Sequence, residues 1–297
     1  MEIFQLGFRA MGCACEMAAA FPDEAAARAG LGQALAEVER IEAKYSRYQP
    51  DSVTSRINAA AASAAWFECD QETLDLLDHG DYLHRLSDSL FDMTAGVFRR
   101  VWDFQRAEIP SAEAIAGVRQ QLGWSRVARE GQRVRLEVGM ELDFGGFGKE
   151  YAVDRAAEVL LAGGCQHGIV NLGGDVRVIG PKPDGTPWGV GIQDPRQPGK
   201  LLASIPLLGG GLATSGDYER FFELEGRRYC HIINPLNGYP VTEWQSISVL
   251  APTALIAGGM ATIAMLREQG AIDFLKARAR GFLAIDQHKR IFTHQGA

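Results

Sequence analysis

The stretch LDFGGFGKEYAVDRA at residues 142–156 decides the fold of this chain, because a glycine-rich turn in it leads into a helix. Its three glycines allow a tight turn and let backbone N–H groups approach an anion. The segment from Lys149 to Leu161 is helical in character and stops at Gly163. The stretch predicts either a plain strand-to-helix turn with Lys149 in solvent, or a site where Lys149 and the positive helix end meet a phosphate.

Upstream of this turn the sequence predicts three helices. The first runs from Asp23 to Tyr45, with apolar residues recurring every three or four positions along one side. The second is capped by Asp70 and carries its leucines along one side. The third is shorter and runs from Ser111 to Gly123. The first two helices are expected to pack on each other.

Beyond Trp124 the apolar residues alternate, as in strands, and surround a turn at Glu130–Gly131. Further expected elements are strands at 169–172, 176–179, 189–192 and 246–250, a hairpin at 221–224 and 229–233, helices from 253 and around 272–275, and a terminal hairpin around 286–289. These elements lack a regular strand–helix–strand rhythm. The sequence therefore predicts an α+β fold of mixed, largely antiparallel sheets with flanking helices.

Composition narrows the class of protein and its partners. With 297 residues, 46% of them hydrophobic, the chain can bury a sizeable core. Its five cysteines are scattered without a C-x-x-C pair, which favours neither a disulfide framework nor a zinc ribbon and suits a reducing compartment. A formal charge of −7 and the lack of a Lys/Arg-rich run argue against binding to nucleic acid.

Two segments bear on location. Residues 1–20 lack the uninterrupted apolar core of a secretory signal, so we expect a cytoplasmic protein. Residues 245–266 carry no charge, but Pro252 and two glycines interrupt them. A buried strand followed by a buried helix is therefore favoured over a transmembrane segment.

Generic nucleotide-binding motifs are missing from the sequence: there is no G-x-x-x-x-G-K-[ST], and no G-x-G-x-x-G joins a strand to a helix. Nine other segments carry the functional signal. They are Met11–Gly12, YSRYQPDSVTSRIN (45–58), FDMTAGVFRRVWDF (91–104), LDFGGFGKEYAVDRA (142–156), NLGGD (171–175), GIQDP (191–195), ATSGDYERFF (213–222), HIINPLNGYPV (231–241) and AGGMAT (257–262). In this order and spacing they resemble the ApbE-type flavin transferases, also called FAD:protein FMN transferases, over roughly residues 8–270.

The resemblance implies a fold and a reaction. The fold is an ApbE-like, T-fold-related architecture over residues 1–297, as a single domain or as two subdomains with the FAD site between them. The reaction binds FAD and, with a divalent metal such as Mg²⁺, transfers its FMN half through a phosphoester bond to a Thr or Ser of an acceptor protein, with release of AMP.

The resemblance also implies which residues form the site. Asp143 and Lys149 contact FAD, while the backbone carbonyl of Gly146 and the side chain of Thr262 face the metal. Further residues assigned to the flavin, its ribityl chain or its surroundings are Met11, Tyr48, Asp92, Thr94 and Ile232. An aromatic ring such as that of Tyr48 is well suited to cover one face of the flavin.

Several of these residues have a purely structural alternative. Tyr48 could be an ordinary packing residue after the first helix, and Asp92 could be a turn or helix cap. His231, in HIINP, is the candidate base by its likeness to the family's H-I-I-D-P. Phosphoryl transfer needs positioning, charge neutralisation and a base for the attacking hydroxyl, which a neutral imidazole can supply. A lone His beside a strand is otherwise more often structural, and Asp217 either orients it or belongs to a turn.

The chain departs from the family at the metal site. The family usually reads A-D-A-x-x-T where this chain reads AGGMAT, so Gly258 stands where an Asp binds the metal, while Thr262 is kept. Loss of that carboxylate weakens a Mg²⁺ site. Glu150 replaces a Gly after the lysine and sets a negative charge where phosphate is expected, unless it reaches the metal instead of the missing Asp. Other departures are Asn234, Met93 and Cys13.

Three functions follow from these observations. The first is an active, metal-dependent FMN transferase in which Glu150 or another carboxylate compensates for Gly258. The second is an FAD-binding carrier or scaffold with weak or lost catalysis. The third is an FAD pyrophosphatase that transfers FMN to water. We favour the transferase, because His231, Lys149, Asp143 and Thr262 are all present.

Overall fold

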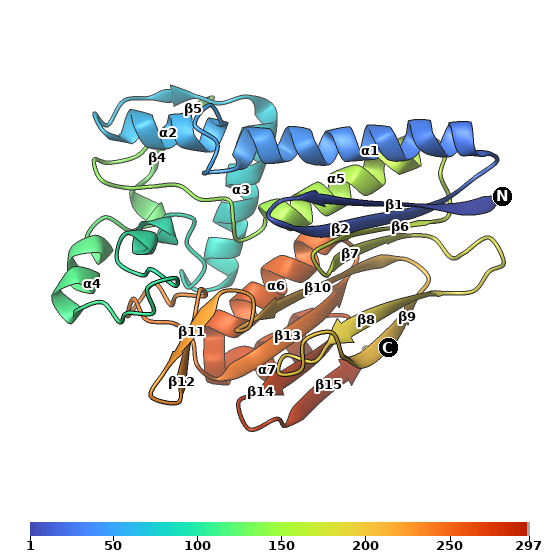
Figure 1. Ribbon diagram of the computed structural model, residues 1–297. Helices are drawn as coiled ribbons and strands as arrows, with labels where there is room; N and C mark the ends of the chain where they lie inside the picture. The colour runs from blue at the N-terminus through green and yellow to red at the C-terminus, as the bar shows by residue number, and fades with distance from the viewer. Residues whose placement is uncertain (296–297) are drawn as a thin grey trace.

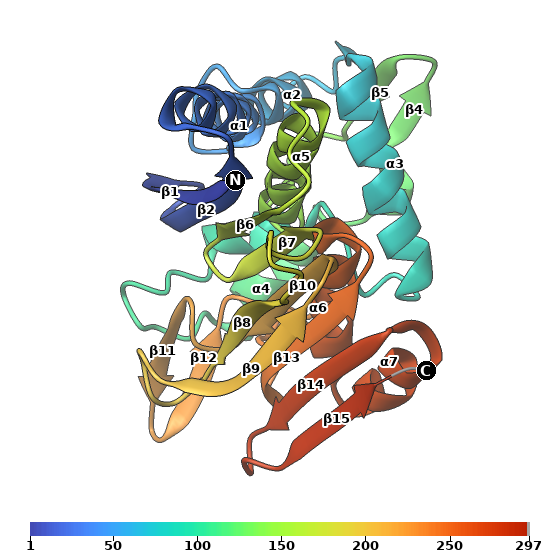
Figure 2. The same ribbon diagram turned by 90° about the vertical axis from the view of Figure 1, so that its right-hand side faces the viewer.

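An eight-stranded antiparallel sheet forms the body of the protein in the computed structural model, which describes residues 1–295 (Figure 1). From one edge to the other its strands are β1 (Glu2–Ala10), β2 (Cys13–Phe21), β6 (Gly168–Leu172), β7 (Asp175–Ile179), β10 (Gly210–Gly216), β13 (Trp244–Ala251), β14 (Gly281–Asp286) and β15 (Ile291–Gln295). Figure 2 shows them stacked from β1 near the top to β15 at the bottom. Antiparallel neighbours need no crossover helix, so the helices gather on one face.

The first two strands are joined by a two-residue turn, Met11–Gly12. Ala10 pairs with Cys13 across it, and Met11 and Gly12 have φ angles of +54° and +74°. Positive φ at both central positions gives a turn whose twist matches that of the strands. The turn lies beside the Gly173–Gly174 turn between β6 and β7, because the Gly173 amide donates to the carbonyl of Ala14 (3.1 Å).

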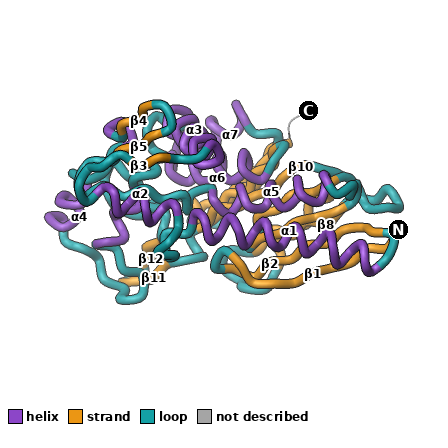
Figure 3. Tube along the Cα trace, turned by 90° about the horizontal axis from the view of Figure 1, so that it is seen from above, coloured by secondary structure: helices purple, strands orange, loops and turns teal. Residues whose placement is uncertain are grey.

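Three helices cover one face of the sheet: α1 (Glu24–Tyr45), α5 (Gly148–Ala162) and α6 (Ala254–Arg267). Figure 3 shows α1 and α5 side by side along the strands, while α6 packs on β10 and β13. Side-chain oxygens of Asp23 and Thr253 cap α1 and α6. The apolar sides of all three helices share one core with the sheet. Helix α7 (Ala271–Arg278) follows α6.

The opposite face is covered by a hairpin of β8 (Trp188–Gln193) and β9 (Leu201–Leu207). Val190 and Ile192 of this hairpin pack on Val176 and Val178 of β7 in a second apolar cluster. Because side chains alternate along a strand, β7 and its neighbours place every second side chain on one face of the sheet and the others on the opposite face. The sheet is therefore buried on both sides in this region.

The remaining elements lie at one end of the sheet (Figure 1). They are α2 (Val53–Ala61), α3 (Gln71–Leu86), α4 (Ala112–Arg119), a small sheet of β3 (Phe67–Glu68), β5 (Arg133–Arg135) and β4 (Ala128–Glu130), and a hairpin of β11 (Phe221–Leu224) and β12 (Arg227–Cys230). Trp102 joins the hairpin to this end: its ring stacks on Tyr229 at 6.0 Å, and its indole N–H donates to the carbonyl of Gly238 (2.8 Å). This contact fixes the strand that leads to His231.

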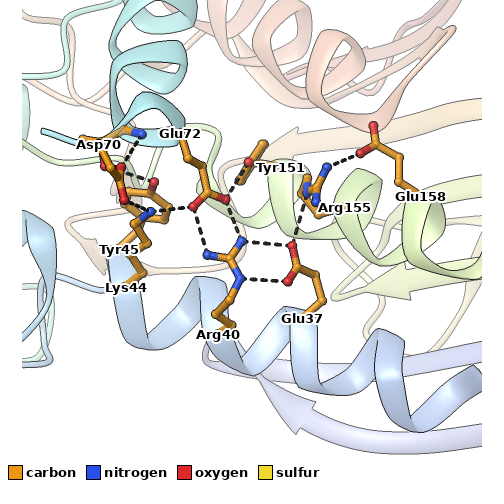
Figure 4. Close-up of polar contacts among 10 residues, drawn as sticks. Glu37, Arg40, Lys44, Tyr45, Asp70, Glu72, Tyr151, Arg155 and Glu158 are labelled. Carbon is orange, nitrogen blue, oxygen red and sulfur yellow. Dashed lines mark hydrogen bonds and ion pairs between the residues drawn. The ribbon is translucent and has the colours of Figure 1, made fainter. Parts of the chain in front are cut away.

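An ion-pair network ties α5 to α1 and α3 (Figure 4). Its hub is Glu72, which accepts from Arg40 (2.6 Å), Lys44 (2.6 Å) and the hydroxyl of Tyr151 (2.8 Å). Arg40 also reaches Glu37, which accepts from Arg155 on α5 (3.2 Å). The network holds the helix that begins at the glycine-rich turn.

Most of the expected elements are present. The helix and strand predicted within residues 245–266 are α6 and β13, and both are largely buried. In the part of the chain that the structure describes, no helix is long and apolar enough to cross a membrane. The sequence analysis did not foresee β1, β2, β9, β10 or α2, and the third helix ends at Arg119, before the expected Gly123.

Candidate functional site

The glycine-rich turn at 142–148 is as tight as the sequence predicts. The carbonyl of Phe144 accepts from the amides of Phe147 (3.1 Å) and Gly148 (2.7 Å). A Cβ at Gly146 would lie 2.8 Å from the ring of Phe91, so only glycine fits there. No side chain caps α5 at Phe147, the residue before its first turn. The positive end of α5 is thus left for another partner, as an anion site requires.

Lys149 lies in the first turn of α5 and faces β7. Its ammonium is 2.9 Å from the carboxylate of Asp175, which is 2% exposed. A Cβ at Gly173 would lie 2.8 Å from the Cys13 sulfur and 3.5 Å from the Lys149 nitrogen, so these residues meet at one place. Burial opposes the charge on Lys149, but Asp175 and Glu150 raise its pKa above its usual value. Lys149 is therefore a fixed cation beside the helix end.

Glu150 lies next to Lys149 and is buried. Desolvation, with a further contribution from the charge of Asp175, raises the pKa of its carboxyl to about 8. Cys13 adds no charge nearby, because burial and the neighbouring Cys15 raise the pKa of its thiol to about 12. Thr262 on α6 is half-buried, and its hydroxyl lies 3.0 Å from that of Ser215 on β10.

These residues bear on the metal that the sequence implies. Within residues 1–295, no group of three or more His, Cys, Asp or Glu side chains is placed to hold a metal ion. The residues that the resemblance assigns to the metal, together with their neighbours, offer hard oxygens: the hydroxyls of Thr262 and Ser215, the carbonyl of Gly146 and the carboxyl of Glu150, which lies against Gly258. Mg²⁺ binds such oxygens and keeps several waters, so the donor set fits Mg²⁺ and does not fit a softer metal.

His231 follows β12 directly, and its amide donates to the carbonyl of Arg220 (2.9 Å). Its side chain is exposed to solvent. Desolvation, followed by the positive charges of Arg220 and Lys149, lowers the pKa of His231 to about 4. The imidazole is therefore neutral at pH 7.

Asp217 does not orient His231. Its carboxylate accepts two hydrogen bonds of 2.7 Å from Arg196 and one of 2.9 Å from Gln287. Since Asp217 is 2% exposed, these donors satisfy a buried carboxylate. The alternative that places Asp217 in the structure of the turn is the one observed.

Tyr48 and Asp143 are joined through Arg47. Arg47 donates to Asp143 (2.5 Å) and to the hydroxyl of Tyr48 (3.1 Å), and Arg220 also reaches that hydroxyl (3.4 Å). Asp143 accepts a further bond from the amide of Gly145 (2.8 Å). The ring of Tyr48 is 69% exposed, with the Arg47 guanidinium over it at 5.1 Å. An exposed ring between two guanidinium groups can stack on a planar ligand.

Asp92 and Thr94 are hydrogen-bonded to each other, and the residue between them contacts the glycine-rich turn. One oxygen of Asp92 accepts from the amide (2.7 Å) and the hydroxyl (2.6 Å) of Thr94, and the other accepts from the amide of Trp124 (2.9 Å). The Thr94 hydroxyl in turn accepts from the amide of Gly123. The carbonyl of Met93, between them, accepts from the amide of Asp143 (2.9 Å). Both side chains thus stabilise the local turn at residues 92–94. This matches the structural alternative for Asp92, a turn or a helix cap.

The other predicted residues lie on the rim of the same region. Met11 is half-buried in the β1–β2 turn, next to Cys13. Ile232 is half-buried after His231, and its carbonyl accepts from the amide of Val241 (3.0 Å). Neither side chain carries a charge, so any contact with a ligand would be apolar.

Three residues of this region escaped the sequence analysis as site candidates. Asp175 is the last letter of NLGGD, and Tyr218 lies within the quoted SGDYE. The ring of Tyr218 lies against Gly216 at the end of β10, and burial and nearby carboxylates raise its pKa. Arg47 lies beside Tyr48, in a quoted segment. Each of these residues lies in a segment that the sequence singles out. Only the three-dimensional structure shows which side chains of these segments lie close together.

The chain is similar to a known family and to several known proteins. The model of the ApbE family matches residues 11–285. An FAD:protein FMN transferase of Haemophilus influenzae is 30% identical over 246 residues, which cover 78% of this chain and 71% of that protein. The ApbE protein of Thermotoga maritima superposes with a TM-score of 0.89 at 30% identity, over 99% of this chain and 97% of that one. The flavinyl transferase ApbE of Pseudomonas stutzeri gives 0.86 at 27% identity, over 99% and 95%.

Proposed function

Because this chain belongs to the ApbE family, we propose that it is an FAD:protein FMN transferase, which moves FMN from FAD to an acceptor protein and releases AMP. The Haemophilus influenzae relative bears the name of this activity, and the Pseudomonas stutzeri structure is of a flavinyl transferase. The acceptor group is a Thr or Ser hydroxyl of that protein, and the cytoplasm is the expected location.

The observation that supports this function is a chain of hydrogen bonds between the glycine-rich turn and the segment of His231. Arg47 donates to Asp143 and Tyr48, Arg220 donates to the same Tyr48 hydroxyl, and the carbonyl of Arg220 accepts from the amide of His231. Helix α5, which begins at this turn with Lys149 in its first turn, has no side-chain cap. A diphosphate at the end of α5 would meet backbone amides and a fixed cation on one side. A neutral base would then lie within the same region, where the FAD phosphates and the acceptor hydroxyl must come together.

The residues of the chain divide the work of phosphoryl transfer as follows. Lys149 and the amides of the turn bind and orient the diphosphate, and Tyr48 covers the flavin from the open side. The imidazole of His231 takes the proton from the acceptor hydroxyl. The hydroxyl oxygen forms a bond to the phosphorus on the flavin side, the bond from that phosphorus to the bridging oxygen breaks, and AMP leaves with the electron pair.

The hydroxyl of Thr262 and the carbonyl of Gly146 would help to hold a Mg²⁺ ion at the same place. When bound, Mg²⁺ neutralises charge on the phosphate oxygens during transfer. FAD is the substrate, and the metal assists its binding. We also propose that the site lies between two parts of one domain: the sheet with its covering helices, and the end that carries α3, α4 and the β11–β12 hairpin.

Incubation with FAD, Mg²⁺ and a candidate acceptor domain tests this proposal. Intact mass spectrometry should show one FMN added to the acceptor, and a chelator should prevent the addition. His231→Ala should abolish the addition of FMN to the acceptor, while the fluorescence of FAD is still quenched when FAD binds. FMN and AMP in solution without a labelled acceptor would identify a pyrophosphatase, and bound, unchanged FAD would identify a carrier.

A further inference from the structure

Helices α5 and α6 pack in opposite directions, in a register that one residue fixes. The carboxylate of Asp154 on α5 accepts from the amides of Ala254 (3.0 Å) and Leu255 (2.8 Å) at the start of α6. Glu150 lies one helical turn before Asp154, and Gly258 lies one turn after Ala254. Because the helices run in opposite directions, the contact at Asp154 brings Glu150 to Gly258.

The carboxylate of Glu150 fills the space that a side chain at position 258 would need. A Cβ built on Gly258 would lie 2.5 Å from Oε1 of Glu150, 2.6 Å from its Cγ and 2.8 Å from its Cδ. These separations are shorter than any van der Waals contact between such atoms. A side chain at 258 therefore requires the carboxylate of Glu150 to move. The two departures that the resemblance implies, Glu150 for Gly and Gly258 for Asp, thus lie face to face.

The carboxylate of Glu150 lies against α6 at Gly258, one turn before Thr262. Thr262 is one turn beyond Gly258 on α6, so the two residues share one side of that helix. The contact between Glu150 and Gly258 thus brings the carboxylate to the side of α6 that carries the hydroxyl of Thr262.

Glu150 is buried and forms no direct ion pair in the described part of the chain. It is 8% exposed. Its neighbour Lys149 is bound to Asp175 at 2.9 Å. Burial without an ion pair favours the protonated carboxyl, and a bound cation is one of the few groups that can hold it as the carboxylate.

We propose that Glu150 is the carboxylate ligand of the divalent metal in this chain, supplied from α5 in place of the Asp that α6 lacks. The inference rests on the proposed function, because it completes the metal site of the same transferase. It explains why Gly258 need not abolish metal binding. It also makes Gly258 a requirement of the site, since any larger residue there would displace the ligand.

Binding of Mn²⁺, read from the loss of its free electron paramagnetic resonance signal, tests the proposal without any turnover. The ion would be titrated into the protein with and without FAD. Glu150→Gln keeps the shape of the side chain and removes its charge, so we expect affinity to fall about tenfold or more. Glu158→Gln is the matched control: it removes one charge from the exposed side of the same helix, where Glu158 pairs with Arg155, and should leave affinity unchanged.

The reciprocal exchange gives a second readout. Glu150→Gly should lose Mn²⁺ affinity, and adding Gly258→Asp to it should restore the affinity to within about threefold, because the carboxylate returns from the other helix to the same space. Thermal unfolding of each variant shows whether it is folded. Gly258→Asp alone should lower the unfolding temperature, since its side chain meets that of Glu150.

The outcomes separate this inference from the proposed function. Loss of Mn²⁺ binding in Glu150→Gln, with rescue in the double variant, supports the inference even if no acceptor is ever labelled. Equal Mn²⁺ affinity in the natural chain and in folded Glu150→Gln contradicts it, even if FMN transfer proceeds. Failure of the natural chain to bind Mn²⁺ in either condition, or failure of the folded double variant to recover affinity, also contradicts it.

Discussion

Lys149 of α5 and Asp175 of β7 form an ion pair of 2.9 Å in which the carboxylate is 2% exposed and the lysine side chain 31% exposed. Asp175 also accepts from the amide of Thr214 on β10 (3.1 Å). The pair thus connects the first turn of α5 to two strands of the main sheet. It holds the ammonium where a phosphate would meet it, with little rotamer freedom left to lose on binding.

Lys149→Met should weaken FAD binding and destabilise the fold together. Removal of the cation takes away a phosphate contact, so we expect about a tenfold or larger loss of affinity, measured by flavin fluorescence. It also leaves Asp175 buried and unpaired, which should lower the free energy of unfolding by about 2–3 kcal/mol in urea denaturation.

A double variant separates these two effects. Lys149→Met with Asp175→Asn removes the stranded charge, so stability should return most of the way while FAD affinity stays low. If affinity returned as well, Lys149 would be a structural residue and not a phosphate ligand.

The pH dependence of FMN transfer should show that the catalytic base has a low pKa. The pKa of His231 is lowered to about 4, so the imidazole stays neutral as the pH falls from 8 to 5. Because kcat/KM reports the free enzyme, its acid limb should lie near pH 4 and well below the ordinary histidine value of about 6.5. His231→Ala should lower kcat/KM by about 10²–10⁴ and remove this limb. An acid limb at the ordinary histidine value would show that the base is another group or that His231 is not desolvated.

His79 should make the fold sensitive to acid. Its Nε2 is buried and has no hydrogen-bond partner in the described part of the chain, and desolvation lowers its pKa to about 4. In the unfolded chain His79 binds a proton near pH 6.5, whereas in the folded chain it does so only near pH 4. The free energy of unfolding is therefore highest above pH 6.5 and decreases as the pH falls towards 4. Between pH 7 and 5 the natural chain should lose about 1–2 kcal/mol more than His79→Phe, measured by urea denaturation. Equal losses would mean that His79 is hydrated in the folded protein.

Glu72 should be the most sensitive member of the network between α1, α3 and α5. Burial opposes its charge, but Arg40, Lys44 and Tyr151 lower its pKa well below the usual range. Glu72→Gln should therefore cost about 2 kcal/mol of stability, because Arg40 and Lys44 each lose one of their two carboxylate partners. Glu158→Gln, in an exposed pair of the same region, should cost less than about 0.5 kcal/mol. If the two substitutions cost the same, the network adds nothing beyond ordinary surface pairs.

Much of the fold was predictable because periodicity and caps are local signals. Asp23, Asp70, Ser111 and Thr253 each cap the helix that follows, as the sequence indicated or implied. The first hairpin was missed because Met11 is a non-glycine residue with positive φ, an unusual choice for a two-residue turn. The short helix α2 was missed because alanines at its end give a weak apolar pattern.

The site was predicted in part, for a physical reason. Motifs identify segments, and the segments at 11, 48, 92, 143–149 and 231 are all found at one end of the helical layer. The partners of each side chain depend on contacts between distant segments, such as Asp175 with Lys149 or Arg196 with Asp217. The contact between Glu150 and Gly258 depends on how helices α5 and α6 are aligned, and this alignment cannot be read from a local sequence pattern.

A crystal structure of the protein with FAD tests the central claim most directly. We predict that the diphosphate lies at the N-terminus of α5, within hydrogen-bond distance of Lys149, with the imidazole of His231 facing the phosphorus on the flavin side. FAD bound elsewhere, with the space between Lys149 and His231 filled by solvent, would contradict the account.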